Sequence, residues 1–129
     1  MVIILAAATI IACTAPKVHD GDTLRCGDER VRLFGVDAPE VRRGAQPAQP
    51  FAYEARDELI RVTRGRVGCR FVERDRYGRF VGRCWSEATP DVNAALIRSG
   101  FATEYRRYAK GRYADDEAKA RADRRGRWR

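Results

Sequence analysis

The amino-acid sequence predicts an α+β domain, mainly a β-barrel, with helices packed beside the strands. Short apolar runs bounded by Gly, Asp and Pro predict several strands. Apolar residues that recur at helical spacing after Phe51 predict a helix between two groups of strands. A length of 129 residues allows one domain with a single modest core.

The first strands are expected in the N-terminal third of the chain. One is expected near Cys13 to His19, and a tight hairpin from Thr23 to Val36 turns at Gly27-Asp28-Glu29. The hairpin returns the chain towards the end of the barrel where Asp22 lies. A polar loop rich in Gly, Pro and Gln follows from Val41 to Pro50.

Two further strands flank a charged turn. They are expected from Gly68 to Glu73 and from Phe80 to Trp85, on either side of Asp75-Arg76-Tyr77-Gly78-Arg79. Gly78 suits a positive φ in this turn.

Three helices are expected. The first, from about Phe51 to Thr63, has an apolar stripe that we interpret as core packing, made of Phe51, Ala55, Leu59 and Val62. The last runs roughly from Ala114 to Arg125, and Trp128 is expected to anchor it to the domain.

The second helix has clear start and stop signals. Thr89 is the expected N-cap, with Pro90 in the first turn and Asp91 near the positive end of the helix dipole. Gly100 is expected to close the helix.

Carboxylates and an arginine lie on either side of the predicted hairpin. They belong to Asp20-Gly21-Asp22-Thr23 and to Arg32-Leu33-Phe34-Gly35-Val36-Asp37-Ala38-Pro39-Glu40. Converging carboxylates are hard oxygen ligands, which suit Ca²⁺. The chain has one His and its four Cys form no C-x₂-C pair, so the sequence excludes a closed zinc site and a two-histidine acid and base pair.

These residue types fit a metal-assisted phosphodiesterase. Without histidine, a metal and arginines can bear the charge of the phosphoryl group while a carboxylate positions the attacking water. Asp22, Asp37, Arg32 and Glu40 fit those roles. Asp-Gly alone is a common turn dipeptide, but the mid-strand arginine, the acids that end the strand and the charged turn at residues 75–79 together make a specific pattern.

The chain resembles the staphylococcal-nuclease-like (thermonuclease) family from Val18 to Trp128. Six segments carry the resemblance in matching order and spacing: V-H-D-G-D-T-L, V-R-L-F-G-V-D-A-P-E, F-A-Y-E-A-R-D-E-L, D-R-Y-G-R, V-N-A-A-L-I-R-S-G-F-A and R-R-G-R-W. The resemblance implies an OB-fold-type five-stranded barrel with three helices. It also implies a Ca²⁺-dependent endonuclease and exonuclease that hydrolyses DNA and RNA and leaves 3′-phosphates.

The resemblance assigns a metal site and a water-activating residue. Asp22 and Asp37 look like the carboxylate ligands of Ca²⁺, and the backbone carbonyl of Ala38 looks like another ligand. Asp20 is similar to an outer acid near the metal, and Glu40 looks like the residue that orients or deprotonates the attacking water.

The resemblance also assigns the phosphate-binding residues. Arg32 and Arg79 look like the two guanidinium groups that clamp the scissile phosphate, a task that suits planar, permanently charged forks. The candidates for substrate binding are Arg76, Tyr77, Tyr105 and Tyr108.

The charge of the chain favours a polyanionic partner. The formal net charge is +8, with 26 Lys and Arg against 18 Asp and Glu. Bases are expected to surround the acidic site at Arg42, Arg43, Arg74, Arg76, Arg106 and Arg107. We therefore expect salt-dependent binding of DNA and RNA, preferably single-stranded or denatured, by a monomer. A basic surface that is merely solvated is the alternative.

The cysteines indicate an oxidising compartment. Cys69 and Cys84 lie symmetrically about the turn at residues 75–79, and Cys13 and Cys26 flank the Asp-Gly-Asp turn, so two disulfides are expected; four buried free thiols are the alternative.

The N-terminal apolar run, Val2 to Ala12, has the length of a signal-peptide core and is too short to span a bilayer. We expect residues 1–12 to be an export segment and residues 13–129 to be the nuclease-like domain of a secreted or periplasmic protein. An extended first strand and lipid attachment at Cys13, which would leave Cys26 unpaired, are alternatives.

Two noncatalytic functions remain as alternatives. One is an OB-type nucleic-acid-binding module, and the other is a protein-interaction module that keeps only the barrel. A pure binder has no need of the complete set of Asp22, Asp37, Glu40, Arg32 and Arg79.

Overall fold

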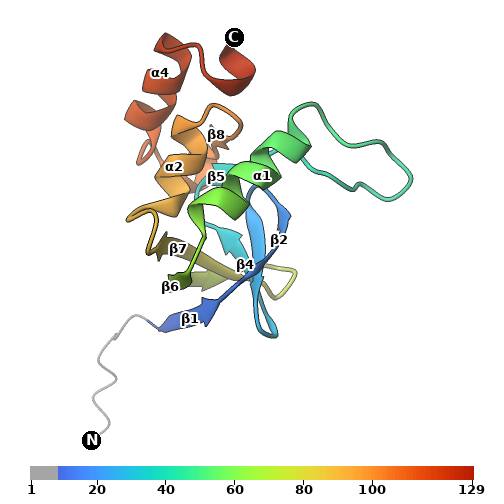
Figure 1. Ribbon diagram of the computed structural model, residues 1–129, viewed down its shortest axis with the longest axis vertical. Helices are drawn as coiled ribbons and strands as arrows, with labels where there is room; N and C mark the ends of the chain where they lie inside the picture. Colours follow the sequence, from blue (N-terminus) through green and yellow to red (C-terminus); the bar gives the residue numbers. More distant parts are fainter. Residues whose placement is uncertain (1–8) are drawn as a thin grey trace, which may run out of the picture.

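A curled mixed sheet forms a half-barrel, and helices pack at one end of it (Figure 1). The computed structural model describes residues 9–129. Within them, one sheet has six strands in the order β1-β6-β7-β4-β3-β2, and a second sheet pairs β5 with β8. The strands are β1 (Ile10–Thr14), β2 (Lys17–Asp20), β3 (Thr23–Cys26), β4 (Glu29–Leu33), β5 (Val36–Asp37), β6 (Arg66–Arg74), β7 (Phe80–Ser86) and β8 (Thr103–Glu104). The predicted α+β barrel class is confirmed.

The single strand expected at residues 13–19 is two strands in the structure. β1 pairs with β6 and β2 pairs with β3, so the two strands lie at opposite ends of the strand order. The chain breaks between them at Ala15, which has a φ of 50°, and at Pro16, which has no N–H to donate to a ladder. This division accounts for a sheet of six strands among residues 9–129 where five were expected.

The hairpin of β3 and β4 forms as predicted. Cys26 pairs with Glu29 across the two-residue turn Gly27-Asp28, where Gly27 has a φ of 60°. The second strand ends at Leu33, however, and Val36–Asp37 forms β5, which pairs with β8. Asp37 is therefore positioned by the second sheet and not by the β3–β4 hairpin.

A parallel pairing closes the half-barrel. β4 pairs with β7 in the register Val31 to Phe80, Arg32 to Val81 and Leu33 to Gly82. Because Arg79 directly precedes β7, this register brings the two predicted phosphate-binding arginines, Arg32 and Arg79, to one region of the fold.

Helix α1 (Ala52–Val62) confirms the first predicted helix. Its buried stripe consists of Ala52, Ala55, Leu59 and Val62. Phe51 was expected in this stripe, and that expectation is wrong: Phe51 is the N-cap, with a φ of 68° and 38% of its surface exposed. The left-handed backbone at Phe51 starts the helix one residue later and leaves the ring at the surface.

Helix α2 (Val92–Arg98) begins at a different residue from the one predicted. Asp91, not Thr89, is the N-cap, and its carboxylate accepts the Ala94 N–H at 3.0 Å. The backbone of Thr89 is used in a turn with Ser86. Gly100 ends the helix as expected, with a φ of 81°, and a Cβ there would lie 2.2 Å from the Arg125 carbonyl oxygen.

The C-terminal segment contains one helix that was not predicted. After β8 come α3 (Arg106–Ala109), α4 (Ala114–Ala122) and a 3₁₀ turn η1 (Gly126–Trp128). The last predicted helix therefore ends at Ala122 and not at Arg125. Trp128 is partly buried, and the Arg121 guanidinium of α4 lies 4.1 Å from its ring centroid. The ring therefore lies beside α4, and its role in anchoring this helix to the domain stays a prediction.

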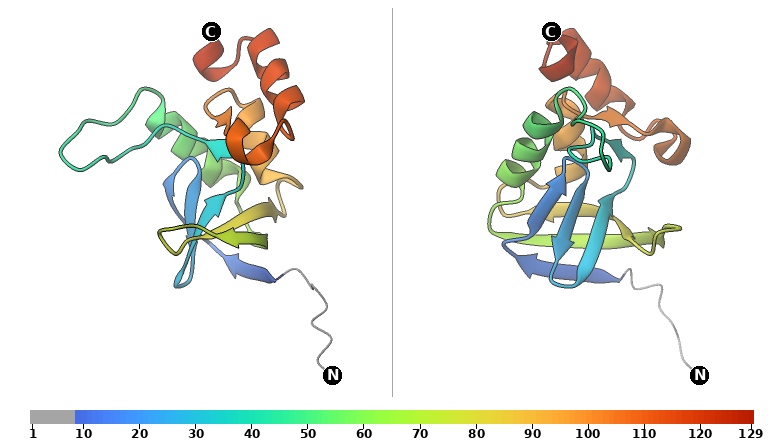
Figure 2. Two further views of the ribbon diagram at one scale, coloured as in Figure 1. Left: turned by 180° about the vertical axis from the view of Figure 1, so that it is seen from behind. Right: turned by 90° about the vertical axis from the view of Figure 1, so that its right-hand side faces the viewer.

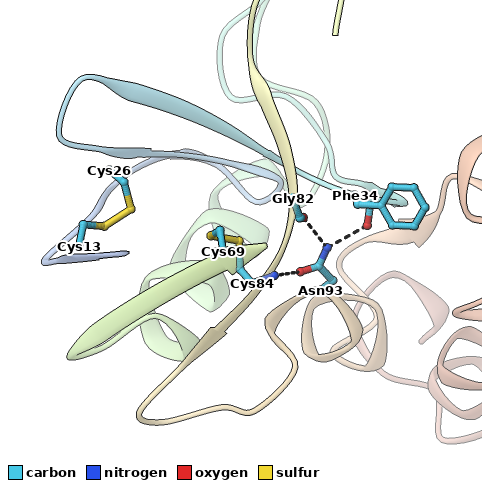
Figure 3. The surroundings of a disulfide bond; sticks show 7 residues. All are labelled: Cys13, Cys26, Phe34, Cys69, Gly82, Cys84 and Asn93. Atoms are coloured by element: carbon cyan, nitrogen blue, oxygen red, sulfur yellow. Dashed lines mark hydrogen bonds between the residues drawn. A yellow bond between two sulfur atoms is a disulfide. The ribbon is translucent and has the colours of Figure 1, made fainter. Parts of the chain in front are cut away.

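Both predicted disulfides are present. Cys13 of β1 bonds to Cys26 of β3, and Cys69 of β6 bonds to Cys84 of β7 (Figure 3). The residues that the structure describes contain no free cysteine. Two disulfides indicate an oxidising compartment.

Part of the predicted export segment lies outside the described residues, which begin at residue 9. Ile10 to Ala12, the C-terminal end of that segment, belong to β1. Among residues 9–129, no helix has the length and apolar character needed to cross a membrane.

Asn93 joins the closing strands to α2. It is fully buried, and its Oδ1 accepts the Cys84 N–H at 2.9 Å. Its Nδ2 donates to the carbonyls of Phe34, at 2.9 Å, and Gly82, at 3.1 Å (Figure 3). One amide therefore fixes β7 and the segment after β4 to the start of α2.

We expect Asn93→Ala to lower the free energy of unfolding by about 3 kcal/mol, because it leaves buried backbone groups without partners. Urea unfolding of the purified protein measures this loss. Arg61→Ala is the control, since it removes only the ion pair with Glu58 at an arginine side chain that is 64% exposed, and should cost under about 1 kcal/mol. Equal losses in the two variants would contradict the role of Asn93.

Candidate active site

Asp22 lies in the turn between β2 and β3, where the β3–β4 hairpin begins and α1 packs against the chain. It directly precedes β3 and is buried. A Cβ on neighbouring Gly21 would lie 2.6 Å from the Ala55 Cβ, so only glycine lets α1 pack this closely. The backbone carbonyl of Asp22 accepts the Leu33 N–H at 2.8 Å, which fixes this residue against the end of β4.

Three groups bind the Asp22 carboxylate. Oδ2 accepts the Ala38 N–H at 2.8 Å and lies 3.2 Å from Nη1 of Arg32, and Oδ1 accepts the Thr23 hydroxyl at 2.9 Å. Burial raises the pKa of the Asp22 carboxyl, although Arg32 and the bonds from Ala38 and Thr23 act in the opposite direction.

Arg32 is held by carbonyl oxygens as well as by Asp22. Nη1 donates to the Val36 carbonyl and, at 3.3 Å, to the Leu33 carbonyl. Its side chain is 18% exposed. The guanidinium is therefore fixed in orientation while part of it stays open to solvent.

The other predicted metal and water residues follow on one short segment. Asp37 is exposed at the end of β5, and Ala38 is buried, with its N–H on Asp22. Glu40 is exposed, and its backbone is held at both sides by Gln49, whose Oε1 accepts the Glu40 N–H at 2.8 Å and whose N–H donates to the Glu40 carbonyl at 2.9 Å. Sequence reasoning missed Gln49, because a glutamine in a polar loop carries no signal of its own.

The carboxylates do not form a ready cluster. Among residues 9–129, no group of three or more His, Cys, Asp and Glu side chains is arranged to hold a metal ion. Asp20, the predicted outer acid, is buried and accepts the Val41 N–H at 2.8 Å. The structure thus joins Asp22 directly to Ala38 and places Asp37 and Glu40 on the segment around it.

The charged turn before β7 is tightly organised. Oδ1 of Asp75 accepts the N–H groups of Tyr77 and Arg79, both at 2.9 Å, and Oδ2 accepts Nε of Arg79 at 2.7 Å. Burial would raise the pKa of Asp75, but the bonds from Arg79 and Tyr77 prevail and lower it. Gly78 has the predicted positive φ, 78°. Asp75 therefore positions Arg79, a role that the sequence did not reveal.

The predicted phosphate-binding and substrate-binding residues share one groove. It has a volume of about 510 Å³, and we call it the arginine groove. Its lining includes all six of them: Arg32, Arg76, Tyr77, Arg79, Tyr105 and Tyr108. The rings of Tyr105 and Tyr108 contact each other at a tilt of 43°, with ring centroids 5.0 Å apart. Arg107, one of the predicted surrounding bases, also lines the groove.

Asp37 and Ala38 line a different hollow, of about 410 Å³. Phe51, Phe101 and Arg127 also line it. Asp22 contacts one residue of each hollow. Its carboxylate pairs with Arg32, which lines the arginine groove, and accepts the N–H of Ala38, which lines the second hollow.

We expect Arg32→Ala to lower the free energy of unfolding by about 3 kcal/mol, because it leaves the buried Asp22 carboxylate without its cation. The matched control is Arg66→Ala, which breaks an ion pair with Glu87 whose side chains are 78% and 62% exposed and should cost under about 1 kcal/mol. Chemical unfolding at neutral pH gives both values. A cost for Arg32→Ala no larger than that of the control would show that the pair with Asp22 does not stabilise the fold.

Known proteins provide an independent comparison. The chain is 41% identical over 120 residues to a "Succinoglycan biosynthesis protein ExoI" of Rhizobium meliloti, covering 88% of this chain and 62% of that protein. It is 36% identical over 110 residues to a "Probable endonuclease lcl3" of Botryotinia fuckeliana, covering 82% and 42%. It is 37% identical over 115 residues to a "Probable endonuclease LCL3" of Schizophyllum commune, covering 76% and 39%.

The chain thus spans between 39% and 62% of the lengths of these three relatives. The family described as "Staphylococcal nuclease homologue" matches residues 30–129, which include β4 from its second residue, the charged turn and the helices that the structure describes. This chain belongs to the staphylococcal nuclease homologue family.

Proposed function

We propose that this protein is a Ca²⁺-dependent, sugar-nonspecific nuclease that hydrolyses phosphodiester bonds of DNA and RNA to 3′-phosphate products. The arginine groove carries the proposal, because Arg32 and Arg79 line it together next to the buried carboxylate of Asp22. Two guanidinium groups on one open groove suit a phosphodiester, whose charge grows as it is attacked. Family membership and the relatives named as probable endonucleases support the same reaction.

The two arginines differ in how they are held, and both are ready to bind phosphate. Asp22 and two carbonyls orient Arg32, and Asp75 orients Arg79. Because these groups already orient both arginine side chains, the arginines lose little conformational freedom when a phosphate binds. The tyrosine pair Tyr105 and Tyr108 offers aromatic surface to a base or sugar in the same groove.

Glu40 is the proposed group that orients or deprotonates the attacking water. Its position is fixed by the two backbone bonds with Gln49, and these bonds leave its exposed carboxylate unused. A carboxylate in this state can accept a proton from water.

The donor set suits Ca²⁺. Asp22, Asp37 and the Ala38 carbonyl offer only oxygen, the ligand atom that Ca²⁺ prefers. Asp22, Asp37 and Ala38 would hold the ion, and Ca²⁺ bound there would stabilise negative charge on the phosphate.

We propose a secreted or periplasmic location, which the two disulfides support. We also propose that the protein acts as a monomer on single-stranded or denatured DNA and RNA. The alternative function is a noncatalytic nucleic-acid-binding module, which keeps the basic groove and needs no group that activates water.

The decisive experiment compares Glu40→Gln with the wild-type protein in the release of acid-soluble nucleotides from denatured DNA and from RNA. We expect turnover to fall by roughly 10²-fold to 10⁴-fold while binding remains, because the substitution removes only the group that acts on water. Glu54→Gln, the same change at an exposed position of α1, is the control and should keep full activity. Full activity in Glu40→Gln would refute the assignment, and binding without cleavage by the wild type would favour the noncatalytic module.

Metal binding can be measured without activity. We expect Ca²⁺ to raise the melting temperature of the wild-type protein, since a ligand that binds only the folded state stabilises it. Asp37→Asn should remove most of this shift, whereas Asp57→Asn, at an exposed acid of α1, should keep it. A Ca²⁺-induced shift of the same size in Asp37→Asn and the wild type would exclude Asp37 as a ligand.

A further inference from the structure

Three cations lie in a row across the face of the sheet beside the arginine groove. The strand register places Lys17 of β2 opposite Arg25 of β3, and Arg25 opposite Arg30 of β4. All three side chains are exposed. The right-hand view of Figure 2 shows the three strands side by side, in blue to cyan, with no helix lying over them. We call Lys17, Arg25 and Arg30 the cation row.

The alternation of the strands separates this row from the core. Val31 and Leu24, the neighbours of Arg30 and Arg25 in sequence, are buried. Residues that face each other directly across antiparallel strands point to the same side of the sheet, so the three cations share the outer face. Two strand spacings separate the ends of the row, which is roughly 10 Å.

The cation row continues into the arginine groove. Its three residues line a hollow of about 510 Å³ together with His19 and Arg79. Arg79 also lines the arginine groove. In addition, Arg30 donates to the Tyr77 carbonyl at 2.6 Å, which ties the row to the charged turn. One surface therefore runs from the proposed catalytic arginines to Lys17.

The positive charge of the row is uncompensated. Like charges directly opposite each other destabilise a sheet. Within residues 9–129, neither Lys17 nor Arg25 takes part in an ion pair. Asp20 is the acid that lines this hollow, and it is buried and bound to the Val41 N–H. A bound chain of phosphates would supply the missing negative charge.

We propose that the cation row is a second binding site, which takes the sugar–phosphate backbone of a single-stranded nucleic acid whose reacting part lies in the arginine groove. The identity of the ligand rests on the proposed function. A single line of cations matches one backbone rather than the two of a duplex. The row would hold long strands on the protein and contribute nothing to a nucleotide that fills only the groove.

The test is the salt dependence of binding. Fluorescence anisotropy measures the affinity for a labelled single strand of about twelve nucleotides between about 50 and 200 mM salt, with EDTA present to prevent metal-dependent cleavage. The variant is Lys17→Ala with Arg25→Ala, which spares Arg30 and its bond to the charged turn. The matched control is Arg64→Ala with Arg70→Ala, which removes two exposed charges that line neither the groove nor this hollow.

We expect the slope of log K against log salt to become shallower by about 1.4 in the variant, because each phosphate contact of a single strand contributes about 0.7. The control should keep the wild-type slope. Unchanged slopes in both double variants, or equal reductions in both, would overturn the second site. Cleavage itself is measured separately, in the nucleotide-release assay with Ca²⁺. If the wild type does not cleave there, but its salt slope depends on Lys17 and Arg25, the second site is kept and the proposed catalysis is refuted.

Discussion

The buried carboxylate of Asp22 is the group on which the candidate site depends. It joins the residue before β3 to the Arg32 side chain of β4 and to the Ala38 N–H after β5. A charge in this position is tolerated only while its donors and its cation remain in place. The position of Arg32, the proposed phosphate-binding residue, and that of the proposed metal segment are therefore not independent, since one carboxylate fixes both.

Much of this arrangement follows from local sequence signals. The turn at Gly27-Asp28 defines the hairpin, and the symmetric placement of Cys69 and Cys84 about the charged turn defines a disulfide. The matching motifs contain four of the residues that line the arginine groove together, Arg32, Arg76, Tyr77 and Arg79. These features were predictable because each depends on neighbours in the chain or on a specific pattern.

Other features depend on distant partners and could not be predicted. The break at Ala15 separates β1 and β2, which lie at opposite ends of the strand order and pair with β6 and β3. Asp91 and Thr89 are both good capping residues, and only the turn between Ser86 and Thr89 decides between them. Helix α3 has four residues, too few to show a helical period. The bonds from Gln49 to Glu40 and from Asp75 to Arg79 likewise appear only in three dimensions.

The parallel pairing of β4 with β7 has a consequence for how the protein acquires its site. Arg32 and Arg79 belong to two separate hairpins, and only this pairing brings them together. Contacts between distant parts of a chain form late and slowly, because loop closure must precede them. Either hairpin alone carries only one of the two guanidinium groups that we propose bind phosphate. The growing chain therefore remains without a complete site until the half-barrel closes, and fragments from a cut between the hairpins regain it only by reassociating.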